Sequence, residues 1–167
     1  MEKLHQSRIN KRDILFGIIA AVVIIADQLT KWLIVHTIPN NTVFWDAGIF
    51  QIVHIQNTGV SFGMFQGYIW VIIAIVFLEM AFILAVVYMF RSRLSFLDSV
   101  LIRVGAGLVM GGAIGNQIDR LVQRYVTDFI DFKIWPIFNV ADMCAVTGTI
   151  IIAYCILFKS GLLVSKK

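Results

Sequence analysis

Aspartates are concentrated in one stretch of an otherwise apolar chain. The protein has 167 residues, of which 59% are hydrophobic and 14% charged, whereas about a quarter of the residues in an ordinary soluble domain are charged. Residues 115–144 nevertheless contain Asp119, Asp128, Asp131 and Asp142. Two carboxyl groups held close together cannot both ionise readily, so one keeps a proton while the other stays charged. Such a pair can take a proton from an attacking water and give one to a departing amine, which would hydrolyse a peptide bond.

Other chemistries are open to the polar residues of this chain. His36 and His54 could bind zinc together with aspartates, but no HExxH or comparable spacing is present. Ser61 and Lys31 could form a nucleophilic Ser–Lys pair. A buried polar network that only fixes helix packing would also place acidic groups among apolar ones. Ion or proton transport through the same acidic cluster is the alternative function that we keep.

Four apolar stretches are long enough to hold these residues in a membrane. A hydrocarbon core of about 30 Å requires about 20 apolar residues in a helix, and the stretches 14–35, 68–90, 99–118 and 138–158 meet this length. No small-residue cleavage site follows the first stretch, which we therefore interpret as a retained helix rather than a signal peptide. The predicted fold class is an all-α membrane protein, a four-transmembrane-helix bundle forming one integral-membrane domain over residues 1–167.

The basic residues predict the orientation of this bundle. They lie before the first span, between the second and third spans, and after the fourth: Lys3, Arg8, Lys11, Arg12, Arg91, Arg93, Lys159, Lys166 and Lys167. These regions share one side of a four-span protein, and the positive-inside rule makes that side cytoplasmic. Both termini are thus predicted to be cytoplasmic, with residues 37–67 and 119–137 outside. The net charge of +4 follows from this distribution, and we expect no nucleic-acid partner.

Residues of the first outer segment predict a small extracytoplasmic β-sheet. Pro39, Asn40 and Asn41 form a turn signal, and residues 50–55 are rich in side chains that favour strands. Aromatic residues nearby would give the sheet a side that faces lipid. We therefore expect the sheet to lie on the outer membrane surface.

The predicted topology brings distant polar residues to one level. Asp27 lies about 20 Å into the first span, in its outer third, and Lys31 follows at the i+4 spacing that lets an acid and a base share a helix face. A structural ion pair that stabilises a polar patch is the plainest interpretation of these two residues. The third span ends outside near Asp119, and the fourth begins outside near Asp142, with Asp128 between them. Carboxyl groups from the two ends of the sequence should therefore gather near the outer surface.

Three other features of the spans carry structural predictions. Glu79 lies near the middle of the second span, where we expect a protonated or internally hydrogen-bonded structural residue. Cys144 and Cys155 lie about 16 Å apart along one predicted helix, too far to form a disulfide. Small residues let membrane helices approach closely, so the third span should be the central one. Its glycines are Gly105, Gly107, Gly111, Gly112 and Gly115.

Several short motifs together resemble the bacterial prolipoprotein signal peptidases, also called signal peptidase II. They occur in the family's order within a chain of the family's size: DQLTK at 27–31, NTG at 57–59 before FG at 62–63, GGAIGNQIDR at 111–120, VTDF at 126–129 and FNVAD at 138–142. Each motif alone is weakly specific, whereas the complete set is highly specific. The resemblance covers nearly the whole chain.

The resemblance implies roles for individual residues. Asp128 and Asp142 would be the catalytic pair, with the VTDF context favouring Asp128 over Asp131. The substrate-binding residues would be Asn57, Asn116, Arg120 and Asn139, supported by Asp27, Lys31 and Asp119. The resemblance also implies a sheet that cradles the substrate and a loop or helix between spans three and four. Ser61 stands where the family often has alanine, which argues against a nucleophilic serine.

The resemblance further implies an enzyme that removes signal peptides from diacylglyceryl-modified prolipoproteins. It would be an aspartic endopeptidase of the bacterial cytoplasmic (inner) membrane, cleaving before the lipidated cysteine. Its active site would lie near the outer leaflet, and its partners would be lipid-modified prolipoproteins and membrane lipids. We expect it to need no metal and no organic cofactor.

Overall fold

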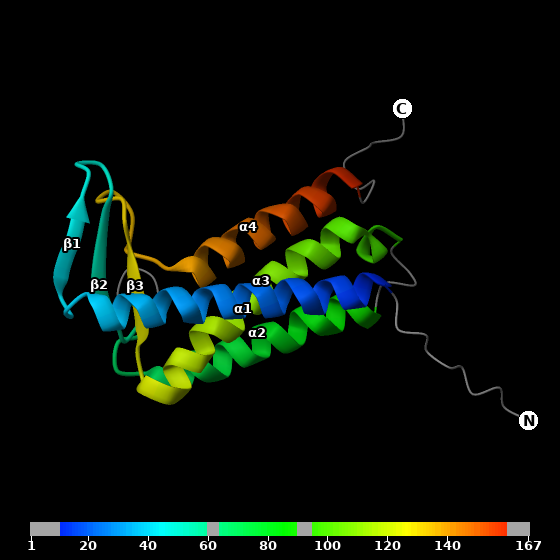
Figure 1. The fold of residues 1–167 in the computed structure, drawn as a ribbon. Coiled ribbons are helices and arrows are strands. Elements are labelled where there is room, and N and C mark those ends of the chain that lie inside the picture. The colour runs from blue at the N-terminus through cyan, green and yellow to red at the C-terminus, as the bar shows by residue number, and fades with distance from the viewer. Residues whose placement is uncertain (1–10, 60–63, 90–94, 160–167) are drawn as a thin grey trace, which may run out of the picture.

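Four helices and a small sheet make up the fold in the computed structural model, which describes residues 11–59, 64–89 and 95–159 (Figure 1). In chain order the elements are α1 (Lys11–Thr37), β1 (Thr42–Asp46), β2 (Gln51–Asn57), α2 (Ile69–Met89), the 3₁₀ helix η2 (Ser95–Asp98), α3 (Val100–Gln123), β3 (Val126–Asp131), α4 (Val140–Tyr154) and the π-helical turn η3 (Cys155–Lys159). Ser61, Arg91, Arg93 and the basic residues at positions 3, 8, 166 and 167 lie outside the described residues.

The protein is a multi-pass membrane protein. Within the described residues, three helices are long and apolar enough to cross a bilayer, namely Lys11–Thr37, Ile69–Met89 and Val140–Phe158. They coincide with the predicted spans 14–35, 68–90 and 138–158. Helix α3, on the predicted third span, is not among them, because glycines and the polar residues Arg103, Asn116 and Gln117 lower its hydropathy. It also continues to Gln123, five residues past the predicted end.

Helix α3 is the central helix, as its small residues predicted. It packs against α1, α2 and α4, and its glycines permit the closest approaches. A Cβ added to Gly111 would lie 2.8 Å from the carbonyl oxygen of Ala20 in α1. Gly105 lies against Gly148 of α4, where a Cβ on Gly105 would be 2.9 Å from the carbonyl oxygen of Gly148. The α3 backbone therefore comes close to the backbone of both α1 and α4.

The sheet is antiparallel, with the strand order β1-β2-β3, and caps one end of the bundle (Figure 1). Strand β2 corresponds to the predicted strand-rich residues 50–55. Strand β3 is an addition to the prediction: the segment between α3 and α4, expected to be a loop or helix, forms a strand followed by an irregular loop. Ile55 pairs with Asp128 and Asn57 with Val126, so β2 aligns the outer segment with the acidic one.

The opposite end of the bundle is held by a buried arginine. Arg103 is fully buried, and its Nε donates to Asp13 at 3.0 Å. Its Nη1 donates to the carbonyl of Leu97 at 3.3 Å, and its guanidinium lies 5.1 Å from the ring centre of Tyr88. These contacts join α1, α2 and η2 to α3. The start of α1 and the end of α4 lie at this end, away from the sheet (Figure 1).

Substituting one helix-contact glycine should destabilise the bundle. The Cβ of a Gly148→Ala variant would meet the backbone of Gly105, so we expect a loss of about 1–3 kcal/mol, as for other overpacked sites. The matched control is Gly17→Ala in α1, where a Cβ meets nothing within 4 Å. Thermal unfolding in detergent micelles would compare the two, and equal midpoints would contradict the contact.

Candidate active site

The Lys31 ammonium group is the centre of a buried polar network. Lys31 is only 4% exposed, and its Nζ lies 2.8 Å from Asp27 Oδ2 and 3.0 Å from Asp119 Oδ2. Its third contact is a hydrogen bond of 2.8 Å to Asn116 Oδ1. An ammonium group has three hydrogens to donate, so Lys31 is fully satisfied by two carboxylates and one amide. The ion pair expected between Asp27 and Lys31 is therefore present, and Asp119 and Asn116 extend it into a larger polar network.

Asp27 connects this network to the start of α4. It is fully buried, and its Oδ1 accepts a 3.0 Å hydrogen bond from the backbone N–H of Ala141. The first N–H groups of a helix have no partner within the helix, and a carboxylate there also interacts favourably with the helix dipole. Gly115 makes room for this contact, since a Cβ at that position would lie 2.6 Å from Asp27 Oδ2.

Asp142 is oriented by its own helix start. Asn139 is the N-cap of α4, where its side chain accepts from the Asp142 N–H at 3.0 Å and its own N–H donates to Asp142 Oδ2 at 3.2 Å. This reciprocal arrangement is a capping box with aspartate in place of the usual glutamate. The other oxygen, Asp142 Oδ1, accepts from Asn116 Nδ2 at 2.8 Å. Because the Asn116 amide also accepts from Lys31, it connects the ammonium group to Asp142.

Asp128 lies on β3 between two asparagine amides. Its Oδ2 accepts from Asn57 Nδ2 at 2.9 Å, and its Oδ1 accepts from Asn139 Nδ2 at 2.7 Å. Burial, and then the negative charge of Asp142, raise the pKa of Asp128 to about 7. Asn139 therefore contacts both carboxyl groups, through its side chain on Asp128 and its backbone N–H on Asp142.

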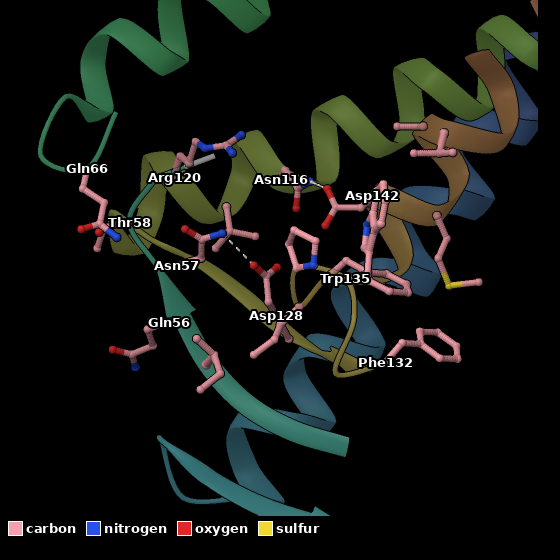
Figure 2. Close-up of a pocket in the computed structure, with 18 of the residues that line it drawn as sticks. Gln56, Asn57, Thr58, Gln66, Asn116, Arg120, Asp128, Phe132, Trp135 and Asp142 are labelled. Carbon is pink, nitrogen blue, oxygen red and sulfur yellow. Dashed lines mark hydrogen bonds between the residues drawn. The ribbon is translucent and has the colours of Figure 1, made fainter. Parts of the chain in front are cut away.

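The two carboxyl groups line one open cavity of about 870 Å³. Figure 2 shows both among the lining residues, with dashed lines marking the bonds to Asn57 and Asn116. Aromatic and apolar side chains form much of the remaining wall: Val126, Phe132, Trp135, Pro136, Ile137, Phe138, Met143 and Val146. The cavity thus joins the carboxyl pair, of which Asp128 is buried and Asp142 is partly exposed, to an apolar surface.

Arg120 brings a cation to the same cavity. Its Nη1 donates to Gln117 Oε1 at 3.3 Å, and the Gln117 Nε2 donates to the carbonyl of Ile73 in α2 at 3.0 Å. Arg120 is 7% exposed, and its Nε has no hydrogen-bond partner in the described part of the chain.

The structure brings together all nine residues that the sequence singled out. Asp27 and Lys31 come from α1, Asn57 from β2, Asn116, Asp119 and Arg120 from α3, Asp128 from β3, Asn139 from the cap of α4 and Asp142 from its first turn. Their roles stay predictions. Asp131 does not line the cavity and binds Gln51 Nε2 at 2.6 Å instead.

The structure bears on two of the alternative sites, the zinc site and the Ser–Lys pair. His36 and His54 each contact a separate backbone carbonyl, of Trp32 and Ile38, and no group of three potential metal-ligating side chains occurs among the described residues. Ser61 lies outside those residues. Lys31, the proposed partner of Ser61, is occupied by the acidic network.

Sequence reasoning missed three residues that complete the network. Gln28 donates to Asp119 Oδ1 at 3.0 Å, the backbone N–H of Thr127 donates to Asp119 Oδ2 at 3.2 Å, and Gln117 holds Arg120. The two glutamines could have been found from the sequence, because each is a polar residue in an apolar helix. Gln28 directly follows Asp27, and Gln117 directly follows Asn116. Nothing in the sequence indicates the backbone contact of Thr127.

The family model and the similar protein sequences indicate the same family. Residues 19–158 match the family described as signal peptidase (SPase) II. A lipoprotein signal peptidase of Dehalococcoides mccartyi (strain BAV1) is 42% identical over 141 residues, covering 83% of this chain and 86% of the relative. One of Moorella thermoacetica is 36% identical over 147 residues, covering 87% and 95%. A bacterial membrane enzyme solved at 2.3 Å resolution has a TM-score of 0.71 and 30% identity, with 92% and 93% covered.

Removing the Lys31 charge should destabilise the protein strongly. A Lys31→Met variant leaves Asp27 and Asp119 buried without their cation, and an uncompensated buried charge costs about 3–5 kcal/mol. The matched control is Lys133→Met, which removes an exposed pair with Asp46 and should change stability little. Denaturant or thermal unfolding in micelles would measure both. Similar losses in the two variants would contradict the central place of Lys31.

Proposed function

Because the chain belongs to the signal peptidase II family, we propose that it removes signal peptides from diacylglyceryl-modified prolipoproteins, cutting before the lipidated cysteine. Asp128 and Asp142 would form the catalytic pair of an aspartic endopeptidase. Family membership favours this reaction over ion or proton transport by the same acidic cluster.

The main support for an aspartic mechanism is the placement of the two carboxyl groups. Two carboxyl groups from separate elements contact the same residue, Asn139, and line the same cavity. The pKa of Asp128 is raised to about 7 by burial and by the charge of Asp142. A pair that shares one proton near neutral pH is the arrangement that acid–base hydrolysis of an amide requires.

In the proposed reaction the pair gives its shared proton to the amine and gains a new one from water. The ionised carboxylate takes a proton from water, and the water oxygen forms a bond to the scissile carbonyl carbon. The protonated carboxyl then gives its proton to the amine as the carbon–nitrogen bond breaks, so the pair ends with one proton, as it began. Arg120, Asn57 and Asn116, which line the cavity, would bind the polar groups of the substrate backbone, which need partners wherever water is scarce. Asn139, which was predicted to join them, is fully buried and does not line the cavity, so it would instead hold the two carboxyl groups. The reaction needs no metal or organic cofactor.

The shape of the cavity supports a lipid-anchored substrate. From the carboxyl pair it extends along α4 to Met143 and Val146, whose side chains are 50% and 59% exposed on a helix that can cross the bilayer. A diacylglyceryl chain and a signal-peptide helix would lie in the same membrane layer as this wall. Anchoring the substrate there makes part of the encounter effectively intramolecular.

We place the protein in the bacterial inner membrane with four spans, α3 being the third. Both termini would then be cytoplasmic, and the sheet and carboxyl pair would lie near the outer leaflet. The polar residues that lower the hydropathy of α3 support this placement, because they face other helices: Arg103, Asn116, Gln117, Asp119 and Arg120 are all buried.

Replacing either catalytic carboxyl should abolish cleavage. We expect Asp128→Asn and Asp142→Asn each to lower kcat by about 10²–10⁴-fold, the usual contribution of a general acid or base. The assay would follow cleavage of a lipidated prolipoprotein by protein reconstituted in vesicles. The control is Asp131→Asn, which changes a carboxyl of the same strand outside the cavity. Full activity of either catalytic variant, once shown to be folded, would exclude the pair.

The raised pKa of Asp128 predicts the pH dependence. Activity should fall on the alkaline side with an apparent pKa near 7, because the pair then loses the proton that the departing amine needs. The value belongs to the coupled pair. An alkaline limit that stays well above pH 7, measured as kcat/KM against pH, would contradict a shared proton.

Stability provides a check that does not depend on activity. Since the folded-state pKa of about 7 exceeds the ordinary 3.8, folded protein binds more protons than unfolded protein between these values. The stability contribution of Asp128 is thus complete below about pH 4 and lost as pH rises through about 7. Asp128→Asn should therefore gain stability relative to the parent protein as pH rises from about 4 to about 8, by a few kcal/mol at most. A pH-independent difference in unfolding midpoint would contradict this.

A further inference from the structure

Glu79 is a carboxyl group in the middle of a helix that is long and apolar enough to cross the bilayer. It lies ten residues into the 21-residue helix α2, about 15 Å from either end. Its side chain is exposed on the outside of the bundle, and none of the described residues gives it a hydrogen bond or ion pair. Of the two roles expected for Glu79, protonated or internally hydrogen-bonded, the hydrogen bond is not found among the described residues, and the protonated form stays a prediction.

A carboxyl group at that depth lacks the partners that water would provide. Intramembrane ionisable residues usually face a bundle interior or an aqueous cavity and pair with another polar group. Glu79 lines neither of the two principal cavities.

The residues around Glu79 form a stripe suited to a second helix. Ile75, Glu79, Phe82, Val86 and Met89 follow one another at spacings of four and three residues, the period by which two helices pack along a common seam. Ile75, Phe82 and Met89 are 50%, 68% and 70% exposed, and Val86 is half-buried. We call these five residues the α2 stripe. Helix α2 packs mainly against α3 and lies at the edge of the bundle (Figure 1), so the stripe is open to another chain.

We propose that two copies of this chain associate in the membrane through the α2 stripe, with the Glu79 carboxyl of one copy hydrogen-bonded to that of the other. Two copies insert in the same orientation, so their α2 helices run parallel and their Glu79 residues lie at equal depth. A closed two-fold pairing brings the same residue of each copy together. Two carboxyl groups can pair once at least one carries a proton, because a carboxylic acid both donates and accepts.

A second copy fits the stripe better than a foreign basic helix. The stripe holds a single acidic group flanked by apolar side chains, so it offers no further charge for a basic partner. Self-pairing satisfies both copies with that one residue and leaves the apolar positions to pack against their equivalents. The residues lining the cavity of Asp128 and Asp142 include none from α2, so association leaves substrate access open.

Cysteine cross-linking tests the geometry. Both native cysteines are replaced by alanine in the full-length chain, and Phe82→Cys is compared with Phe77→Cys in lipid vesicles under mild oxidation. Phe82 is on the stripe, whereas Phe77 is also exposed, at 46%, but points about 140° away around α2. We expect a cross-linked dimer from Phe82→Cys only. Equal cross-linking at the two positions would mean random collision and overturn the proposal.

Substitution of Glu79 tests the hydrogen bond. Dimerisation in vesicles is measured by energy transfer between labelled copies over a range of protein-to-lipid ratios. Glu79→Leu should weaken association about tenfold, the effect of one strong hydrogen bond between membrane helices, while Glu79→Gln should retain it because an amide also donates and accepts. A monomeric parent protein, or a Glu79→Leu variant that dimerises equally well, would overturn the proposal. Loss of dimer in Glu79→Gln would instead indicate that a charged group is needed and would exclude carboxyl self-pairing.

Discussion

The buried ammonium group of Lys31 is the constraint on which the site depends. Through Asp27 it reaches the first turn of α4, and through Asp119 it reaches the backbone of β3. Its hydrogen bond to Asn116 connects it to Asp142, because the Asn116 amide also donates to Asp142. One cation thus connects two helices, a helix start and a strand, and each connection ends at an element that carries a catalytic candidate. In an environment with little water, each of these groups would be costly to leave unpaired.

The network also explains how the carboxyl groups of Asp128 and Asp142 can lie in one site despite their mutual repulsion. Bringing two carboxyl groups together is unfavourable when both are ionised, and hydrogen bonds from Asn57, Asn116 and Asn139 offset part of that cost. The capping box at the start of α4, formed by Asn139 and Asp142, fixes the orientation of the Asp142 side chain. Stability and proposed reactivity therefore rest on the same amides.

Close helix packing makes this polar centre possible. Gly112 and Gly115 let α3 approach the backbone of α4 and the side chain of Asp27, and larger residues would separate the groups that Lys31 joins. A second buried cation, Arg103, holds the other end of the bundle through Asp13 and Asp98. Helix α2 takes little part in either cluster. Its outer face carries Glu79, a carboxyl group to which no described residue gives a hydrogen bond or ion pair.

The sequence by itself determined what depends on composition and local spacing: the apolar spans on α1, α2 and α4, the central position of the glycine-rich helix, the Asp27–Lys31 contact at i+4, and, through its motifs, the family. Only the tertiary structure decided which groups meet. Asp27 binds Ala141 across 114 residues, Asn139 contacts both Asp128 and Asp142, residues 126–131 form a strand, and Glu79 faces outward. Hydropathy and spacing describe one helix at a time, whereas these contacts depend on how each helix is rotated and shifted against its neighbours. Those rotations are set by backbone contacts such as that between Gly105 and Gly148, whose partners lie far apart in the chain.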